Sequence, residues 1–432
     1  MRKFSTHTLQ NVPEFKLKLL QWAQQFDKVC YLNSNDSLTK NYSSFDFSLA
    51  VGAVAEITPS QGECFNALQK FHDEKKDWLF GFLSYDLKNE IEDLTSNNPD
   101  FLGFPLLHFF QPEFIFILEK NILKIGFLEN NFSDKKVADL FNEISALQKN
   151  NFSKNEKQLE IKSRINREEY LKTVRIIQQH IRRGDVYELN FCQEFYAENA
   201  HINPTEIYEK LTKIAPNPFS VFYKLENKYL LSASPERFLK RIGNQLISQP
   251  IKGTIKRGAN EQEDEELKKN LFNDQKERNE NVMIVDLVRN DLSRIASRGS
   301  VKVEELFGIY TFSYWHQMIS TISATVSEKV NFTKILKNTF PMGSMTGAPK
   351  IKAMQLIEEL ESTKRGLYSG ALGYITPSGD VDFNVVIRSI LYNEKNNYLS
   401  FMAGGAITEK SMPEQEYEEC LLKATAMFEV LK

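Results

Sequence analysis

Two pairs of glutamates are the first residues that could do chemistry together. Glu277 and Glu280 lie three residues apart, and Glu416 and Glu419 repeat that spacing. On a helix, this spacing puts both carboxylates of a pair on one face. Each pair alone fits a solvated surface as well as a binding site. Four converging carboxylates would raise one another's pKa unless a hard divalent cation neutralised them, and oxygen-only ligation suits Mg²⁺.

A lysine in the segment QPIKGTIKRG (249–258) is a candidate nucleophile. Lys252 follows a β-like run and precedes Gly253. A solvent-facing lysine at the end of a strand is the more common case. A partly desolvated lysine amine, however, has a lowered pKa and can attack an electrophilic carbon. The segment therefore predicts either a surface lysine or a reactive one.

The segment FPMGSMTGAPK (340–350) is similar to a phosphate-binding loop that leads into a helix. It departs from the Walker pattern because only three residues separate its glycines and because Ala-Pro precedes the lysine. A nucleotide-binding P-loop is therefore not expected. Backbone amides ahead of a helix could still hold a carboxylate or an oxyanion, with the hydroxyls of Ser344 and Thr346 nearby. The alternative is a simple helix-capping turn.

A second small-residue run, MAGGAITEKS (402–411), precedes the second glutamate pair. Gly404 and Gly405 would allow the backbone to approach a ligand closely. Arg388 and Lys423 would complete a set of cations for an anionic substrate, because arginine presents a fork that matches a carboxylate. Each of these features alone is also typical of an ordinary surface.

Helices and paired strands must position these residues. Apolar residues at helical spacing predict a helix over Arg167–Arg183, ended by Gly184, and two further helices that carry the glutamate pairs. Apolar runs separated by turn residues predict hairpins, which are expected at 114–129, 221–234, 238–253 and 371–392. Long antiparallel strands flanked by helices fit this pattern better than repeated βαβ units.

The composition of the 432-residue chain indicates a soluble globular protein. Apolar residues make up 41% and charged residues 26%, and the 32 Phe and 16 Tyr argue against intrinsic disorder. The net charge of −3 does not indicate the strongly basic surface with which proteins bind nucleic acids. The four cysteines form no CxxC pair, and the chain has no signal-peptide pattern and no apolar run long enough to span a membrane. A cytoplasmic location is therefore expected.

A polar, Asn/Lys-rich stretch divides the chain into two regions of different texture. This stretch, residues 148–163, is predicted to be a linker or a long surface loop. Residues 1–147 before it are predicted to be an α+β region. Residues 164–432 after it carry every segment discussed above and form the predicted catalytic region.

Several ordered motifs together resemble one family, the chorismate-utilising enzymes. That family includes anthranilate synthase and aminodeoxychorismate synthase components I, and the isochorismate and salicylate synthases. The resemblance covers about Arg164 to Leu431. It is carried by SPERF (234–238), PIKGT (250–254), ENVMIVDLVRNDL (280–292), GSMTGAPK (343–350), RGLYSGALGY (365–374) and the tail GGAITEKS with EYEECLLKA.

The resemblance implies the fold, the ligands and the residues that hold them. The implied fold is α+β, a large two-layered α/β sandwich of long, mostly antiparallel sheets with flanking helices. The N-terminal region would be part of this sandwich. Glu280 and Glu419 would bind Mg²⁺ directly, and Glu277 and Glu416 would hold its waters or orient those ligands. The residues implied to bind the dicarboxylate chorismate are Arg388, Lys423, the amides of Gly404 and Gly405, Tyr368 and Thr254.

Lys252 bears on which branch of the family the chain resembles. Aminodeoxychorismate synthases of this type carry PIKGT, whereas anthranilate synthases usually have alanine in place of the lysine. The implied chemistry is attack by the lysine amine on ring C2 with loss of the C4 hydroxyl, and then attack by ammonia at C4. The chain has no cysteine in a glutaminase-like context. A separate glutamine amidotransferase subunit is therefore expected to supply ammonia.

The sequence is also compatible with two other functions. The chain could be an anthranilate synthase component I, which shares nearly every motif. It could also be a non-catalytic regulator that holds tryptophan near Ser34, where YLNSN (31–35) preserves only part of the pattern found in relatives.

The chain departs from its relatives at two positions. Gln317 stands where many relatives have histidine, and His316 comes one residue earlier. On a helix that shift would turn the side chain by about 100°, so a structural histidine competes with a general acid. Glu188 stands where relatives often have glutamine and where the isochorismate and salicylate synthases have a water-activating lysine. A carboxylate there argues against the water-activating branch.

Overall fold

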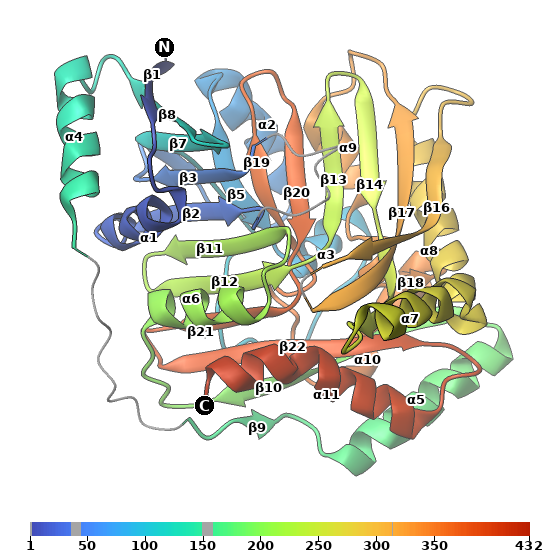
Figure 1. Ribbon diagram of the computed structural model, residues 1–432. Helices are drawn as coiled ribbons and strands as arrows, with labels where there is room; N and C mark the ends of the chain where they lie inside the picture. Colours follow the sequence, from blue (N-terminus) through green and yellow to red (C-terminus); the bar gives the residue numbers. More distant parts are fainter. Residues whose placement is uncertain (1, 36–44, 149–158, 313) are drawn as a thin grey trace.

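Two β-sheets form the framework of the protein (Figure 1). The computed structural model describes residues 2–35, 45–148, 159–312 and 314–432. Within these residues the larger sheet has 12 strands and the smaller sheet has 10. Neighbouring strands pair antiparallel in both sheets. The predicted fold class, an α+β sandwich of antiparallel sheets with flanking helices, is confirmed.

The strands of the larger sheet lie in the spatial order β1 (Arg2–Thr8), β8 (Ile122–Leu128), β7 (Phe114–Glu119), β3 (Phe47–Val51), β2 (Lys28–Asn33), β11 (Phe219–Leu225), β12 (Lys228–Ser234), β21 (Ser389–Asn393), β22 (Tyr398–Ile407), β10 (Glu188–Ala197) and β18 (Gly347–Ala348), and β9 (Lys162–Ser163) also pairs with β10. Those of the smaller sheet lie in the order β15 (Ile251–Lys256), β17 (Trp315–Thr325), β14 (Gln245–Gln249), β13 (Arg237–Ile242), β20 (Val381–Val385), β19 (Ala371–Ile375), β5 (Leu79–Leu83), β6 (Leu107–Gln111) and β4 (Ala55–Ile57), and β16 (Lys302–Thr311) pairs with β17.

Strands from both ends of the chain share each sheet. In the larger sheet β2 pairs with β11, and in the smaller sheet β5 pairs with β19. The N-terminal region is therefore built into both layers. Most of the predicted linker, residues 149–158, lies outside the described residues, so the domain boundary at 148–163 stays a prediction.

Helices cover the outer faces of the sheets. They are α1 (Val12–Ala23), α2 (Cys64–Lys75), α3 (Lys88–Ile91), α4 (Asp134–Ala146), α5 (Arg167–Arg183), α6 (Pro204–Ile214), α7 (Glu261–Asn273), α8 (Gln275–Ser293), α9 (Phe332–Thr339), α10 (Lys350–Leu360) and α11 (Pro413–Val430). The helix α5 has the predicted bounds, because a capping box of Asn166 and Glu169 starts it and Gly184, in a left-handed conformation, ends it. Each described helix is too short or too polar to cross a lipid bilayer.

Two large apolar cores hold the layers together. One core joins the facing sides of the two sheets, where Phe82 of β5 meets Tyr223 of β11 with 5.4 Å between ring centroids. The other lies between the larger sheet and helices that include α5, α6 and α11. Burial of these side chains provides the main stabilisation of the sandwich.

The predicted hairpins at 114–129, 221–234 and 238–253 are confirmed as β7–β8, β11–β12 and β13–β14. Within 371–392, β19 and β20 form a hairpin in the smaller sheet, whereas β21 pairs with β12 and β22 in the larger sheet. The helical geometry considered for residues around His316 is wrong. Residues 315–325 form strand β17, so neighbouring side chains point to opposite faces rather than being turned by a helical step. A short apolar run fits either period, which explains the difference.

A buried ion pair fastens the GSMTGAPK segment to the helix that carries Glu280. The ammonium of Lys350 donates to Asp291 of α8 and to the carbonyl oxygen of Pro341, the latter at 2.8 Å. Both side chains of the pair are less than one tenth exposed. Lys350 is therefore a structural residue that joins a loop to a helix.

We expect Asp291→Ala to destabilise the protein by about 3 kcal/mol or more, because it leaves a buried ammonium without its counter-ion. The double variant Asp291→Leu/Lys350→Met should be more stable than the single variant. The matched control Asp286→Ala breaks an exposed pair with Arg289 on the same helix and should cost less than about 1 kcal/mol. Urea unfolding measures all three, and an equal small loss in each would contradict the account.

Candidate active site

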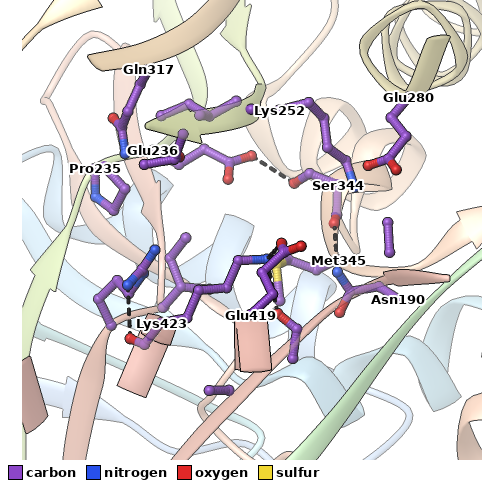
Figure 2. Close-up of a pocket in the computed structure, with 18 of the residues that line it drawn as sticks. Asn190, Pro235, Glu236, Lys252, Glu280, Gln317, Ser344, Met345, Glu419 and Lys423 are labelled. Carbon is purple, nitrogen blue, oxygen red and sulfur yellow. Dashed lines mark hydrogen bonds and ion pairs between the residues drawn. The ribbon is translucent and has the colours of Figure 1, made fainter. Parts of the chain in front are cut away.

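The sequence segments that carry candidate catalytic and binding residues meet in one cavity of about 230 Å³ (Figure 2). The strands β15, β17 and β22 and the helices α8 and α11 contribute side chains to its wall. Further lining residues come from β10, the loop before β13, the 3-10 turn η3 (Gly343–Met345) and the segments that carry Tyr368 and Arg388. Segments more than 150 residues apart in the chain therefore share one site.

Lys252 points into this cavity and not into bulk solvent. Its side chain is 10% exposed, and its Nζ lies 3.0 Å from Oε1 of Glu188, whose side chain is 1% exposed. Burial opposes the lysine charge, but the attraction of Glu188 and then of Glu280 outweighs burial and raises the pKa of Lys252, so the lowered pKa expected of a desolvated reactive lysine is wrong. The second oxygen of Glu188, Oε2, has no hydrogen-bond partner among the described residues.

The first glutamate pair lies on α8, as predicted. Asp274 caps this helix by accepting from the amides of Lys276 and Glu277. Burial raises the pKa of Glu280 to about 8, and the carboxylates of Glu188 and Glu277 add to the shift. Burial also raises the pKa of Glu277, together with repulsion from Glu419. Both side chains of the pair thus lie where a negative charge is poorly solvated.

The second pair lies on α11 and faces the first. Oε1 of Glu419 lies 2.6 Å from Nζ of Lys423, whose charge lowers the pKa of Glu419 to about 2. A Cβ atom at Gly405 would lie between 3.4 and 3.6 Å from Glu416 Oε2, Lys423 Nζ and Glu419 Oε1. These are ordinary van der Waals distances, so the charged groups of α11 lie against Gly405 without requiring a glycine there.

Lys276, which the sequence analysis did not single out, joins the two pairs. Its Nζ lies 3.2 Å from Oε1 of Glu416 and 3.8 Å from Oε1 of Glu280. Burial opposes its charge, but attraction to Glu416, Glu280 and Glu419 prevails and raises the pKa of Lys276. The lysine thus partly neutralises carboxylates from both helices.

These carboxylates fit a divalent cation in charge and in chemistry. Six glutamates, at 188, 236, 277, 280, 416 and 419, face the four cations Lys252, Lys276, Arg388 and Lys423, so this region has two more acidic than basic side chains. Oε1 of Glu280 and Oε2 of Glu416 are buried without a hydrogen-bond partner in the described part of the chain. As they stand, the described side chains form no cluster of three or more ready metal ligands.

Most of the residues predicted to bind substrate line the same cavity. Thr254, Tyr368, Arg388, Gly404 and Lys423 all do so. The guanidinium of Arg388 donates to the carbonyl oxygen of Lys423 at 2.7 Å, and burial lowers the pKa of the arginine. A Cβ at Gly404 would lie 1.9 Å from the carbonyl oxygen of Phe191, so packing of β22 against β10 requires this glycine whether or not a ligand binds.

The two predicted hydroxyls of the GSMTGAPK segment lie in different places. Ser344 lines the cavity and donates to Oε1 of Glu236 at 2.6 Å. Thr346 is not among the residues that line it, and its hydroxyl donates to carbonyl oxygens of its own loop, at Met342 and Gly343.

Glu236 is a site residue that the sequence reasoning missed, although it is the glutamate of the SPERF motif. It is 4% exposed and lies beside Ser344 (Figure 2). Burial raises the pKa of Glu236 to about 7, against the hydrogen bond from Ser344 and the attraction of Lys252. This carboxyl group can hold a proton near neutral pH and release it.

His316 and Gln317 point away from each other, as their positions on β17 require. Gln317 lines the cavity. The ring of His316 is fully buried and makes hydrogen bonds to Asp264 at 2.9 Å and to Thr311 at 3.0 Å. His316 is therefore a structural histidine, which was one of the two alternatives.

Ser34 lies in a second, smaller cavity of about 60 Å³. Its hydroxyl donates to the carbonyl oxygen of Asp46 at 2.8 Å, and Arg237, Tyr374 and Asp382 line other parts of the cavity. Tryptophan binding at this position stays a prediction.

The fold and the cavity define a class of protein: an enzyme built on two large antiparallel sheets, with a buried lysine among carboxylates at its site. A family model described as chorismate binding enzyme matches residues 27–429. The chain belongs to the chorismate-binding enzyme family, as the sequence motifs predicted.

The chain is similar to relatives from two branches of this family. It is 31% identical to anthranilate synthase component 1 of Aquifex aeolicus, over 84% of this chain and 76% of the relative. It is 38% identical to aminodeoxychorismate synthase component 1 of Escherichia coli, over 62% of this chain and 59% of the relative. Among solved structures, anthranilate synthase component I from Streptococcus pneumoniae superposes with a TM-score of 0.76 and 26% identity, covering 99% of this chain and 92% of that one.

We expect Glu280→Gln to stabilise the protein in a chelating buffer, by about 1–3 kcal/mol near pH 9 and by much less near pH 5. The pKa of Glu280 lies at about 8 in the folded protein against an ordinary value of 4.5. Stability of the wild type therefore falls as the pH rises through this interval, and glutamine removes that loss. Urea midpoints measure the effect.

The matched control is Glu266→Gln, because Glu266 is exposed on α7. This variant should leave both midpoints unchanged. A Glu280→Gln protein that is less stable near pH 9 than the wild type would show that the ionised carboxylate is well solvated or paired.

Proposed function

We propose that this protein is component I of an aminodeoxychorismate synthase. It converts chorismate and ammonia to 4-amino-4-deoxychorismate, a precursor of 4-aminobenzoate and folate. The observation that carries the proposal is the position of Lys252, which is enclosed in the cavity among Glu188, Glu236 and Glu280. Similarity to named aminodeoxychorismate synthases supports the same branch.

The proposed reaction uses Lys252 as a nucleophile. Its amine attacks ring C2 of chorismate, and the C4 hydroxyl leaves with a proton from Glu236. Ammonia then attacks C4, and the lysine leaves C2. The lysine divides one difficult displacement into two easier steps. The raised pKa of Glu236 suits a carboxyl that must be protonated before the hydroxyl leaves.

The substrate carboxylates would be held by the cationic side of the cavity. Arg388, Lys423 and the backbone at Gly404 line that side, and Thr254 and Tyr368 lie along the wall. Because Arg388 and Lys423 are partly buried here, their attraction for a carboxylate is stronger than in water.

Mg²⁺ is the proposed cofactor. Glu280 and Glu419 would bind it directly, while Glu277 and Glu416 would hold its waters. When bound, Mg²⁺ supplies positive charge that stabilises the ring carboxylate of the substrate. A separate glutamine amidotransferase subunit would supply ammonia.

The second candidate is an anthranilate synthase component I. It is favoured by the longer alignments, because relatives with that name match over more than four fifths of the chain. A non-catalytic tryptophan-binding regulator gains no support from the cavity, whose charged residues have no evident purpose in such a protein.

One product assay separates these functions. The purified chain is incubated with chorismate, ammonium and Mg²⁺, with and without an aminodeoxychorismate lyase. We expect 4-aminobenzoate only when the lyase is present, and no product after chelation of Mg²⁺. Pyruvate and fluorescent anthranilate without the lyase would identify the second candidate.

Lys252→Ala should abolish amination, because the attacking amine is lost. The protein should still fold, with a lowered unfolding midpoint because Glu188 loses its counter-ion. The control Lys256→Ala alters an exposed lysine on the same strand and should keep full activity. Full activity of the Lys252→Ala protein with ammonia would reject the covalent role.

A further inference from the structure

Glu188 is the carboxylate in direct contact with the proposed nucleophile. Its Oε1 accepts a hydrogen bond from Nζ of Lys252 at 3.0 Å. The other nearby carboxyl groups have different partners, because Glu236 accepts from Ser344 and Glu280 lies closest to Lys276. Glu188 is therefore hydrogen-bonded directly to the nitrogen that must react.

The backbone around Glu188 is held tightly by the GSMTGAPK segment. Glu188 pairs with Ala348 across β10 and β18, and the amide of Tyr187 donates to the carbonyl oxygen of Ala348 at 2.7 Å. A Cβ at Gly347 would lie 2.2 Å from the carbonyl oxygen of Glu188. The segment that resembles an anion-binding loop thus positions a carboxylate.

A lysine ammonium cannot attack carbon, so Lys252 must lose a proton before each turnover. We propose that Glu188 is the proton acceptor: its carboxylate takes a proton from the Lys252 ammonium, and the resulting amine attacks the substrate. Oε2 of Glu188 is buried and has no hydrogen-bond partner within the described chain. No second donor among these residues therefore competes for the proton-accepting capacity of this carboxylate. The inference rests on the proposed function and adds a residue to it.

The proposed sequence balances protons and charge. Glu188 takes one proton from Lys252, the N–C2 bond forms, the C4–O bond breaks, and the hydroxide takes the proton of Glu236 and leaves as water. Ammonia then forms the C4–N bond as the N–C2 bond breaks, which returns a neutral lysine amine. Glu188 gives its proton back to the lysine, and the new ammonium group at C4 returns one to Glu236. Lys252, Glu188 and Glu236 thus regain their starting protonation states.

Charged groups on four structural segments surround Lys252. They are Glu188 of β10, Glu236 of the loop before β13, Glu280 of α8 and Glu419 of α11. Replacing Glu188 with glutamine removes the acceptor and the nearest negative charge but keeps the size of the side chain. In that variant the proton of Lys252 must go to solvent, so the reactive fraction of the lysine rises tenfold per pH unit below its pKa.

The test compares kcat of the wild type and of Glu188→Gln between about pH 6 and about pH 9, with saturating substrates and Mg²⁺. Titration of ammonia and of other groups affects both proteins and cancels in the ratio of their kcat values. We expect the wild type to be about 10²–10⁴-fold faster near pH 7 and the ratio to fall towards alkaline pH. A ratio that stays constant with pH would overturn the proposal.

Two variants separate a proton acceptor from a structural role. Glu188→Asp keeps a carboxylate and should lower kcat while keeping the pH dependence of the wild type. Glu194→Gln makes the same change on β10 at a residue paired with Arg164 and should leave both kcat and its pH profile unchanged. A Glu188→Asp profile that matches that of Glu188→Gln would contradict the proposal.

A second readout does not depend on chorismate. Labelling of Lys252 by acetic anhydride, followed by mass spectrometry, reports the pH at which its amine becomes free. We expect this midpoint to shift to lower pH in Glu188→Gln, because the counter-ion is lost. Failure of the proposed function would appear as an active Lys252→Ala protein, whereas an unchanged labelling midpoint would reject the Glu188 contact itself.

Discussion

The balance of charge inside one enclosed cavity is the constraint on which this structure depends. Lys252 and Glu188 form a buried ion pair, and further carboxylates converge on them from α8 and α11. Burial of charge is costly unless each group finds a partner. Lys276 and Lys423 supply part of the compensation, and burial explains why Glu280 and Glu236 bind protons more tightly than ordinary glutamates.

The two sheets bring these charged side chains together. β10 and β22 lie side by side in the larger sheet and carry Glu188 and the glycines of the GGAITEKS segment. β15 and β17 pair in the smaller sheet and carry Lys252 and Gln317. The helices α8 and α11 then close the space with their glutamates. Because each group sits on regular structure, the site is held by the same packing that stabilises the fold.

Local patterns in the sequence predicted the parts of the site but not their contacts. Helical spacing placed both glutamate pairs correctly, and the motifs identified the family. The contact between Lys252 and Glu188 joins residues 64 positions apart, and no periodicity reports such a pair. Thr346 turned out to donate to its own loop, and β17 replaced a possible helix, because local sequence does not decide which way a hydroxyl turns or which period a short apolar run adopts. The role of Glu236 depends on burial, which only the folded chain reveals.

The central claim is that the Lys252 amine forms a bond to the substrate, and direct observation of that bond tests it best. The protein is mixed with chorismate and Mg²⁺ without ammonia, quenched at short times and analysed by mass spectrometry. The account predicts a mass increase equal to chorismate minus one water on the peptide that contains Lys252, and loss of this adduct when ammonium is added. An adduct on another residue, or amination that proceeds without any adduct on Lys252 at any quench time, would contradict it.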